Sequence, residues 1–135
     1  APWRTERIAE FRAMLSTPAI AAALARPADG PARGWRERRF VSADGGAVRQ
    51  GIIDRLVVVG EPGGWRRAEI LDFKTDRLDA DTPSESSLLA KVELYRGQLT
   101  AYRHEIAGQF GLDRSRIATR LLFVAPAVVR EVHET

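Results

Sequence analysis

The sequence has no cysteine and no long apolar run. Without cysteine, disulfide bonds, zinc sites with thiolate ligands and iron–sulfur clusters are excluded, and a metal ion would be held by oxygen or imidazole ligands. The longest apolar runs, residues 19–25 and 121–127, are far shorter than the roughly 20 residues of a membrane-spanning helix. We therefore expect a soluble protein with no membrane partner, and the absence of cysteine is compatible with a cytoplasmic location.

Lysine is almost as scarce. Of the 21 basic residues 19 are arginine, and the two lysines are Lys74 and Lys91. Lysine is a compact charge whose pKa shifts readily, whereas arginine stays protonated, so a lysine retained near two carboxylates suggests a chemical role for Lys74. The net charge of +3 weakly favours a polyanionic partner such as nucleic acid.

Two segments with β-strand character carry charged residues where core residues are expected. They are residues 51–58 and 68–75, joined by a glycine-rich turn. Because side chains alternate along a strand, Asp54 shares a face with apolar residues of the first segment, and Asp72 and Lys74 share a face with apolar residues of the second. These apolar residues are Ile52, Leu56, Val58, Ala68 and Ile70. Charges in such positions indicate a functional site.

The turn also predicts which residues face each other. In an antiparallel hairpin centred near Gly63, the numbers of paired residues add up to about 126, so Asp54 lies opposite Asp72. Like charges that are directly opposed destabilise the strand pair, because their Cβ atoms are only roughly 4.5–5.5 Å apart. A divalent cation would compensate, and Mg²⁺ is typically held by one or two carboxylates together with substrate phosphates.

Helical periodicity is present in two regions. The first covers residues 5–15 and is followed by a short helix that starts at Pro18. The second starts at Thr82-Pro83-Ser84-Glu85, which has the form of a capping box, and runs toward Phe110. The apolar positions are Ile8, Phe11 and Leu15 in the first region, and Leu88, Val92, Tyr95, Leu99, Tyr102, Ile106 and Phe110 in the second. We expect the second set to pack on the sheet.

Further strands are expected before and after these elements. Their composition predicts strands at residues 35–41, 121–125 and 128–132, with a loop at 27–34 and a turn at 42–46. The order of elements is typical of an α/β fold with a central mixed β-sheet flanked by α-helices. A chain of 135 residues, 44% of them hydrophobic, is sufficient for one such domain over residues 1–135.

Three blocks that occur in order support a family resemblance. They are Gly51-x-x-Asp54-Arg55, Asp72-x-Lys74-Thr75 and Tyr95-x-x-Gln98-Leu99-x-x-Tyr102. Their combination resembles the nuclease domain of RecB-type helicase-nucleases in the PD-(D/E)XK superfamily, the C-terminal domain of a UvrD-like chain of the AddA/RecB kind. The resemblance covers about residues 37–132 and implies a restriction-endonuclease-like core.

The resemblance implies a metal-dependent nuclease with a role for each central residue. Asp54 and Asp72 would bind Mg²⁺, for which Mn²⁺ can substitute, and Lys74 would orient or activate the attacking water. Gln98 and Tyr102, on the helix that follows, would complete the catalytic site. Helix geometry agrees with this, because residues three or four positions apart share a face.

Other positions are assigned on the same basis. Glu37 resembles the acidic position that precedes the hairpin in related nucleases, and it would be a third metal ligand. Arg55, Tyr95 and Gln98 would contact nucleic acid, and the phosphates of nucleic acid attract a cation such as Arg55. Further arginines that could contact phosphates are Arg77, Arg96 and Arg103.

The histidines depart from the family pattern. RecB-type domains usually carry a histidine ligand upstream of the strands, whereas His104 and His133 lie downstream, and we expect His104 to be exposed. Because the chain starts at Ala1 without methionine, we expect a fragment of a longer helicase-nuclease. The resemblance then implies an exonuclease in recombinational double-strand-break repair, located in the cytoplasm at the nucleoid. Its partners would be single-stranded DNA ends, the helicase domains of the same chain and a partner helicase-nuclease subunit.

Each assignment has a structural alternative. Asp54, Asp72 and Lys74 could form a buried salt-bridge network, although such a network is costly unless every member is satisfied. Gln98 could be a polar residue on a helix flank, the two tyrosines core residues, and Glu37 a solvated residue paired with arginine. For the whole domain, the alternative is a non-catalytic DNA-binding or scaffolding module that keeps the nuclease fold.

Overall fold

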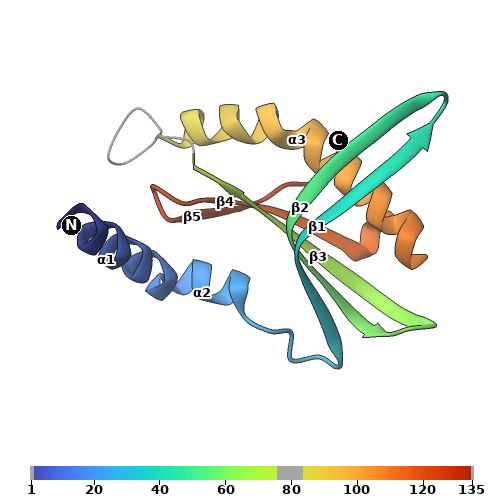
Figure 1. The fold of residues 1–135 in the computed structure, drawn as a ribbon, viewed down its shortest axis with the longest axis horizontal. Helices are drawn as coiled ribbons and strands as arrows, with labels where there is room; N and C mark the ends of the chain where they lie inside the picture. Colours follow the sequence, from blue (N-terminus) through green and yellow to red (C-terminus); the bar gives the residue numbers. More distant parts are fainter. Residues whose placement is uncertain (1, 76–83, 135) are drawn as a thin grey trace.

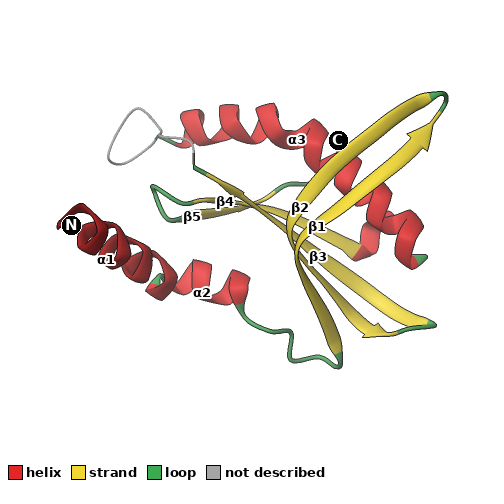
Figure 2. Ribbon diagram, in the orientation of Figure 1, coloured by secondary structure: helices red, strands yellow, loops and turns green. Residues whose placement is uncertain are grey.

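Five strands form one mixed sheet in residues 2–75 and 84–134, which are the residues that the computed structural model describes. The elements are α1 Pro2–Ser16, α2 Pro18–Leu24, β1 Ala32–Asp44, β2 Ala47–Glu61, β3 Gly64–Lys74, α3 Glu85–Phe110, the 3₁₀ turn Arg114–Arg116, β4 Ile117–Phe123 and β5 Val128–Glu131. The strands lie in sequence order, and all neighbours are antiparallel except β3 and β4, which are parallel (Figures 1 and 2). The expected α/β class, with a mixed sheet flanked by helices, is confirmed.

The crossover between the parallel strands is α3. Parallel neighbours cannot be joined by a tight turn, so a long connection is required, and a helix commonly supplies it. The predicted apolar stripe of α3 packs on the sheet: five of its residues are buried and two are partly buried. The buried residues are Leu88, Val92, Leu99, Tyr102 and Ile106, and the partly buried ones are Tyr95 and Phe110.

A side chain caps the start of this helix, and a left-handed glycine ends it. The Ser84 hydroxyl accepts a hydrogen bond from the backbone N–H of Ser87 at 3.2 Å, so the helix starts at Glu85. Gly111 ends the helix in the left-handed conformation, with φ of 63°. The predicted capping box is therefore replaced by a Ser84 cap, and Thr82 and Pro83 lie outside the described residues.

Alternation along the strands separates two apolar clusters, one on each face of the sheet. Ala68 and Ile70 of β3 belong to the cluster under α3, whereas Leu71 belongs to the cluster under α1 and α2. Asp72 and Lys74 continue the alternation of Ala68 and Ile70, so they point toward α3. The charged end of β3 is thus on the face that the crossover helix covers.

β2 and β3 pair in the predicted register. The partner numbers add up to 126 over five consecutive pairs ending at Arg55 and Leu71, and the sum changes to 125 only next to the turn. Asp54 and Asp72 are the next residues on the two strands. Continuing the observed register by one pair places Asp54 opposite Asp72, as predicted.

An irregularity near Asp54 changes which side chains of β2 are buried. Glu37 on β1 has φ of 50°, in the left-handed region, and the pairing of β1 with β2 omits Glu37 and Asp54. Ile53 is fully buried in the same cluster as Leu56, while Ile52 is 40% exposed. The expectation that Ile52 lies on the buried face is wrong, because the irregularity shifts the alternation by one residue.

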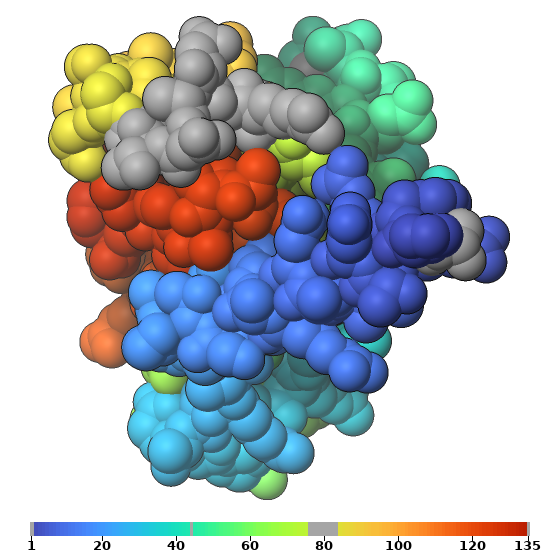
Figure 3. All heavy atoms as spheres, turned by 90° about the vertical axis from the view of Figure 1, so that its left-hand side faces the viewer, coloured from blue at the N-terminus to red at the C-terminus, as the bar shows by residue number. Residues whose placement is uncertain are grey.

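α2 and the C-terminal end of α1 pack on the opposite face of the sheet, and both helices were predicted. They form one band of blue atoms below β5 in Figure 3. Met14 and Ile20 are buried against Leu71 and Leu122. The apolar positions of α1 are exposed instead of packed: Ile8 is 54% exposed, Phe11 53% and Leu15 37%. None of the described helices is both long and apolar enough to cross a lipid bilayer.

Four strands, β1 to β4, are longer than predicted, and β2 and β3 begin at Ala47 and Gly64 rather than at residues 51 and 68. β1 starts at Ala32, inside the segment expected to be a loop, and β4 starts at Ile117 rather than at Leu121. The start of β4 was not predicted because Arg120 lies in this part of the strand, and a charged residue is not typical of a buried strand. The Arg120 guanidinium is satisfied on the sheet surface by Glu69 of β3, at 2.9 Å.

The irregularity predicts losses of stability of different size for substitutions at two adjacent isoleucines. Ile53→Ala should lower the free energy of unfolding by about 2–5 kcal/mol, because it opens a cavity in the core under α3. Ile52→Ala should cost well under half as much, because Ile52 is already partly exposed. Urea denaturation of both variants measures the difference, and equal losses would contradict the shifted alternation.

Candidate active site

Gly51 allows α3 to approach β2 closely. A Cβ atom at this position would lie 2.7 Å from Cζ of Phe40 and 3.1 Å from Cε1 of Tyr102. The two rings meet edge to face, with centroids 5.6 Å apart. There is no room for a side chain between them and the strand, so the glycine determines how near Tyr102 lies to β2.

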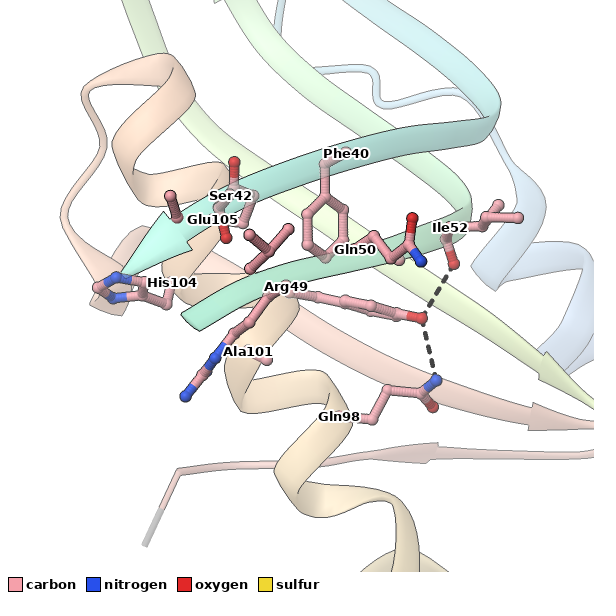
Figure 4. A pocket seen from close by; sticks show the side chains of 13 residues that line it. Phe40, Ser42, Arg49, Gln50, Ile52, Gln98, Ala101, His104 and Glu105 are labelled. Atoms are coloured by element: carbon pink, nitrogen blue, oxygen red, sulfur yellow. Dashed lines mark hydrogen bonds between the residues drawn. The ribbon is translucent and has the colours of Figure 1, made fainter. Parts of the chain in front are cut away.

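A chain of hydrogen bonds connects β2 to β3 through α3. The Tyr102 hydroxyl donates to the carbonyl of Ile52 at 3.0 Å and accepts from Nε2 of Gln98 at 3.0 Å (Figure 4). Oε1 of Gln98 accepts from Nζ of Lys74 at 2.9 Å. Because an ammonium group only donates, Gln98 turns its oxygen to Lys74 and its amide nitrogen to Tyr102. Every group in the chain is oriented by its neighbour.

The Tyr102 hydroxyl stays protonated at neutral pH. Burial is the largest cause of its raised pKa, and the negative charges of Asp72 and Asp54 act in the same direction. The hydroxyl is therefore a donor toward the Ile52 carbonyl and does not serve as a base.

The Lys74 ammonium is held by three neighbours. Nζ lies 2.7 Å from Oδ2 of Asp72, donates to Gln98, and is 3.9 Å from the centroid of the Tyr95 ring. The face of an aromatic ring attracts a cation, so Tyr95 also contributes to its position. The structure thus brings together five of the predicted site residues: Asp72, Lys74, Tyr95, Gln98 and Tyr102.

Asp54 joins this group through the backbone of β3. Its Oδ2 accepts a hydrogen bond from the N–H of Phe73 at 2.8 Å. Beyond the last backbone pair of β2 and β3, the side chain of Asp54 therefore takes over the link between the strands. This bond holds the carboxylate beside Asp72.

Asp72 carries the buried charge of the site. The residue is 3% exposed, and burial raises the pKa of its carboxyl to about 6. A hydrogen bond with Asp54 adds to the rise, while Lys74 acts against it. Oδ2 lies close to Nζ of Lys74 as an ion pair, but no donor among the described residues meets this oxygen with hydrogen-bond geometry. A buried oxygen of this kind is free to accept a further ligand.

The pair of aspartates suits a hard divalent cation. Two adjacent carboxylates, one with an unsatisfied buried oxygen, provide negative charge and oxygen donors, which Mg²⁺ and Mn²⁺ prefer. Within the described ranges, no group of three or more histidine, aspartate or glutamate side chains is close enough to hold a metal ion. Asp54 and Asp72 would therefore hold a cation as a pair, with water and phosphate completing its shell.

Glu37 and Arg55 do not join the site. The side chain of Glu37 is exposed, and it forms no carboxylate group of three with Asp54 and Asp72. Arg55 points to the other face of the sheet, where it donates to the carbonyls of Ala23 and Leu24 at 2.9 Å each. The predicted metal-ligand role of Glu37 and nucleic-acid contact of Arg55 are thus not supported by their positions.

The other arginines considered for phosphate contact are also engaged within the domain. Arg103 is buried, and its guanidinium donates to Thr119 and to the carbonyl of Val132. Arg96 pairs with Glu93 and donates to the carbonyl of His133. Arg77 lies outside the described residues. His104 is exposed, as predicted.

Three contributors to the site were not identified from the sequence. They are the Ile52 carbonyl, the Phe73 N–H and the Phe40 ring. Backbone groups leave no signature in side-chain chemistry. Phe40 could have been found, because a glycine inside a strand often marks a close approach, and the partner of Gly51 across β1 is Phe40.

Comparison with known proteins adds no relative. No family model matches the chain, and no curated protein matches it with significant similarity. The assignment of function therefore rests on the residues described above.

Gly51→Ala should disrupt the site by displacing the Phe40 and Tyr102 rings. We expect the variant to lose about 1–3 kcal/mol of unfolding free energy, as is usual when a well-packed site is overpacked. Gly97→Ala is the matched control, because a Cβ at this exposed helical position meets nothing within 4 Å. It should stabilise the protein by about 0.5–1 kcal/mol. If both variants denature alike in urea, the close approach at Gly51 is refuted.

The metal-free protein should be more stable at pH 5 than at pH 7.5. The pKa of Asp72 is raised from 3.8 to about 6, so the native state binds this proton more tightly than the unfolded chain does. Stability therefore falls as the pH rises through this window, by about 1 kcal/mol between the two conditions. Urea denaturation in EDTA measures the change.

Asp72→Asn should remove most of this pH dependence. Asp113→Asn is its control: hydrogen bonds from Ser115 lower the pKa of the exposed Asp113 carboxyl, so this group stays ionised over the whole pH range of the test. The control should keep the pH dependence of the wild type between pH 5 and 7.5. An unchanged slope in Asp72→Asn would show that another group is responsible.

Proposed function

We propose that this domain is a metal-dependent DNA nuclease that hydrolyses phosphodiester bonds. The observation that carries the proposal is the buried Asp72 carboxylate beside Asp54 and Lys74: its Oδ2 lies 2.7 Å from Nζ of Lys74, and no donor among the described residues meets this oxygen with hydrogen-bond geometry. A carboxylate in this condition is costly in a purely structural role, because a partly satisfied buried charge is less stable than an apolar residue. It is well suited to binding a cation.

The two aspartates would hold Mg²⁺ or Mn²⁺ against the scissile phosphate. A bound divalent cation lowers the pKa of water and stabilises the charge that develops on the phosphate oxygens. Burial restricts the movement of the Asp72 side chain. The Asp54 carboxylate is held by a hydrogen bond from the N–H of Phe73. The protein thus presents both carboxylates in fixed positions before substrate arrives.

Lys74 would hydrogen-bond the attacking water and stabilise negative charge on the phosphate. The water oxygen forms the new bond to phosphorus and releases a proton to solvent, while the bond from phosphorus to the leaving sugar oxygen breaks and that oxygen takes a proton from solvent. A positioned ammonium favours this step because it requires no reorganisation when charge develops. Gln98 and Tyr95 position Lys74, and Tyr102 positions Gln98.

We extend the proposal to the biological setting that the family resemblance implies. The nuclease would act as an exonuclease on single-stranded DNA ends, as part of a helicase-nuclease in recombinational double-strand-break repair, in the cytoplasm at the nucleoid. Its partners would be the helicase domains and a partner subunit. The three sequence blocks support this setting: Lys74 contacts Asp72 of its own block and Gln98 of the third, and Asp54 of the first block accepts a hydrogen bond from the N–H of Phe73.

A non-catalytic DNA-binding or scaffolding module is the competing function. One observation favours it: Lys74 already neutralises Asp72 as an ion pair, so the cluster is partly balanced without a metal ion. Metal binding and cleavage distinguish the two functions directly.

Asp72→Ala and Lys74→Ala should each reduce cleavage of labelled single-stranded DNA in Mg²⁺ or Mn²⁺ by at least about 100-fold, the usual cost of removing one preorganised electrostatic group. Calorimetric titration of Mn²⁺ should show binding to the wild type and none to Asp72→Ala. Lys91→Ala is the matched control, because it removes the other lysine of the chain and should retain activity. Circular dichroism checks that every variant is folded.

Each outcome has a defined meaning. Loss of metal binding and cleavage together in Asp72→Ala would establish the nuclease. Metal binding without cleavage by the wild type would point to a requirement for the helicase partner. Failure of the wild type to bind metal would favour the scaffolding module.

A further inference from the structure

A groove lies between the β1–β2 hairpin and α3. It is a cavity of about 860 Å³, lined by Phe40, Ser42 and Arg49 from the hairpin and by Gln98, Tyr102 and Glu105 from the helix. Figure 4 shows these side chains from close by. A cavity of roughly 300–1,000 Å³ accommodates a molecule of the size of one or two nucleotides.

The groove is continuous with the candidate active site. Gln98 and Tyr102 line it, and the same two residues form the hydrogen-bond chain that ends at Lys74. A polymer bound in the groove would therefore pass directly to the aspartates. The proposed nuclease needs such a contact on at least one side of the scissile phosphate, because phosphate contacts position a nucleic acid.

Arg49 provides an uncommitted cation in the groove. Cross-strand pairing of Ser42 with Arg49, and of Phe40 with Gly51, places these residues on the hairpin face that turns toward α3. The Arg49 side chain is exposed and makes no hydrogen bond or ion pair with any described residue, unlike Arg38, Arg96 and Arg103. A guanidinium in this state is free to bind a phosphate through two N–H groups.

The two walls of the groove differ in charge. The hairpin wall carries Arg49, whereas the helix wall carries Glu105, which accepts a hydrogen bond from Gln109 at 3.0 Å. A phosphate backbone is therefore favoured along the hairpin and disfavoured along the helix. Bases would face the helix wall, where the Gln98 amide and the Glu105 carboxylate can meet their edges, and Phe40 offers an aromatic surface for stacking.

We infer that this groove binds a segment of single-stranded DNA adjacent to the scissile phosphate, with Arg49 as its phosphate contact. The inference rests on the proposed nuclease function for the choice of ligand. Single-stranded DNA is favoured over a duplex because the bases must be unpaired to reach Phe40 and the helix wall. Arg49 is a binding residue in this scheme and takes no part in the chemical step.

The test is binding of a fluorescein-labelled oligothymidylate to the whole domain in EDTA, measured by anisotropy over a range of salt concentrations. Arg49→Ala should raise the Kd about tenfold, as expected for the loss of one charge-assisted contact. It should also reduce the slope of log K against log salt by about 0.7, the value for one phosphate contact on a single strand. A hairpin duplex should bind more weakly than the single strand.

Arg39→Ala is the matched control. Arg39 is also exposed on the hairpin and also makes no hydrogen bond or ion pair with a described residue, but it pairs with Ile52 and so lies on the opposite face. The same change of charge there should alter neither the Kd nor the salt slope by a comparable amount. Equal losses in the two variants would mean general electrostatic attraction and would overturn the groove, as would an Arg49→Ala protein that binds like the wild type.

A second pair of variants tests the groove by its shape. Ala101→Trp narrows the groove without changing charge, and Ala90→Trp adds the same bulk on an exposed part of α3 outside the lining. Only the first should weaken binding, and it should leave the salt slope unchanged. Binding is measured without metal, so it is independent of cleavage: binding that depends on Arg49 in a protein that neither binds Mn²⁺ nor cleaves DNA would retain the groove and refute the nuclease. Cleavage with unaltered binding in Arg49→Ala would retain the nuclease and refute the groove.

Discussion

Burial of a negative charge at the end of β3 is the constraint on which the rest of the site depends. A carboxylate with 5% of its side chain exposed is unfavourable unless neighbouring groups compensate, and Lys74 is the only cation that the structure places against Asp72 within the described residues. Lys74 in turn must be held, so Gln98 and Tyr95 contact it from α3. Gln98 is in turn held by Tyr102, whose hydroxyl donates to the Ile52 carbonyl and so links α3 to β2. A small displacement of α3 would therefore weaken the contacts that hold Lys74 and leave the charge of Asp72 poorly compensated.

Arginine and lysine have different roles in this structure because their side chains differ in shape. Arginines act as forks that join separate elements: Arg67 links Asp29 and Glu69, and Arg55 joins the sheet to the end of α2. Lys74 lies where one compact charge must fit between the Asp72 carboxylate, the Gln98 amide oxygen and the Tyr95 ring. An arginine at position 74 would present a planar group too large for that space.

Much of this arrangement was predictable from the sequence. The turn near Gly63 predicted the register that brings Asp54 and Asp72 together, and the spacing on α3 predicted which of its residues pack on the sheet. The position of a turn and the periodicity of apolar residues are both properties of the chain itself. The roles of Lys74 and Gln98 came from the resemblance, and the structure adds their contacts.

Other features depend on tertiary structure and were missed for that reason. The left-handed conformation of Glu37 depends on how β1 bends over β2, and no preference of glutamate predicts it. The partner of Arg55 is decided by where α2 ends, and the exposure of Phe11 by which side of α1 meets the sheet. Periodicity identifies an apolar face but does not say what it packs against.

The parallel pairing of β3 with β4 has a consequence for the order in which the site forms. The β2–β3 hairpin closes over a turn of a few residues, so Asp54 and Asp72 can meet early, whereas Gln98 and Tyr102 arrive only when the long crossover has closed. Before that moment Lys74 has its carboxylate neighbour but neither of its helical supports. On loop-closure grounds the two carboxylates would meet first, and the contacts from α3 that position the Lys74 ammonium would form last, so that in a partly folded chain Asp72 has a cation beside it that nothing yet holds in place.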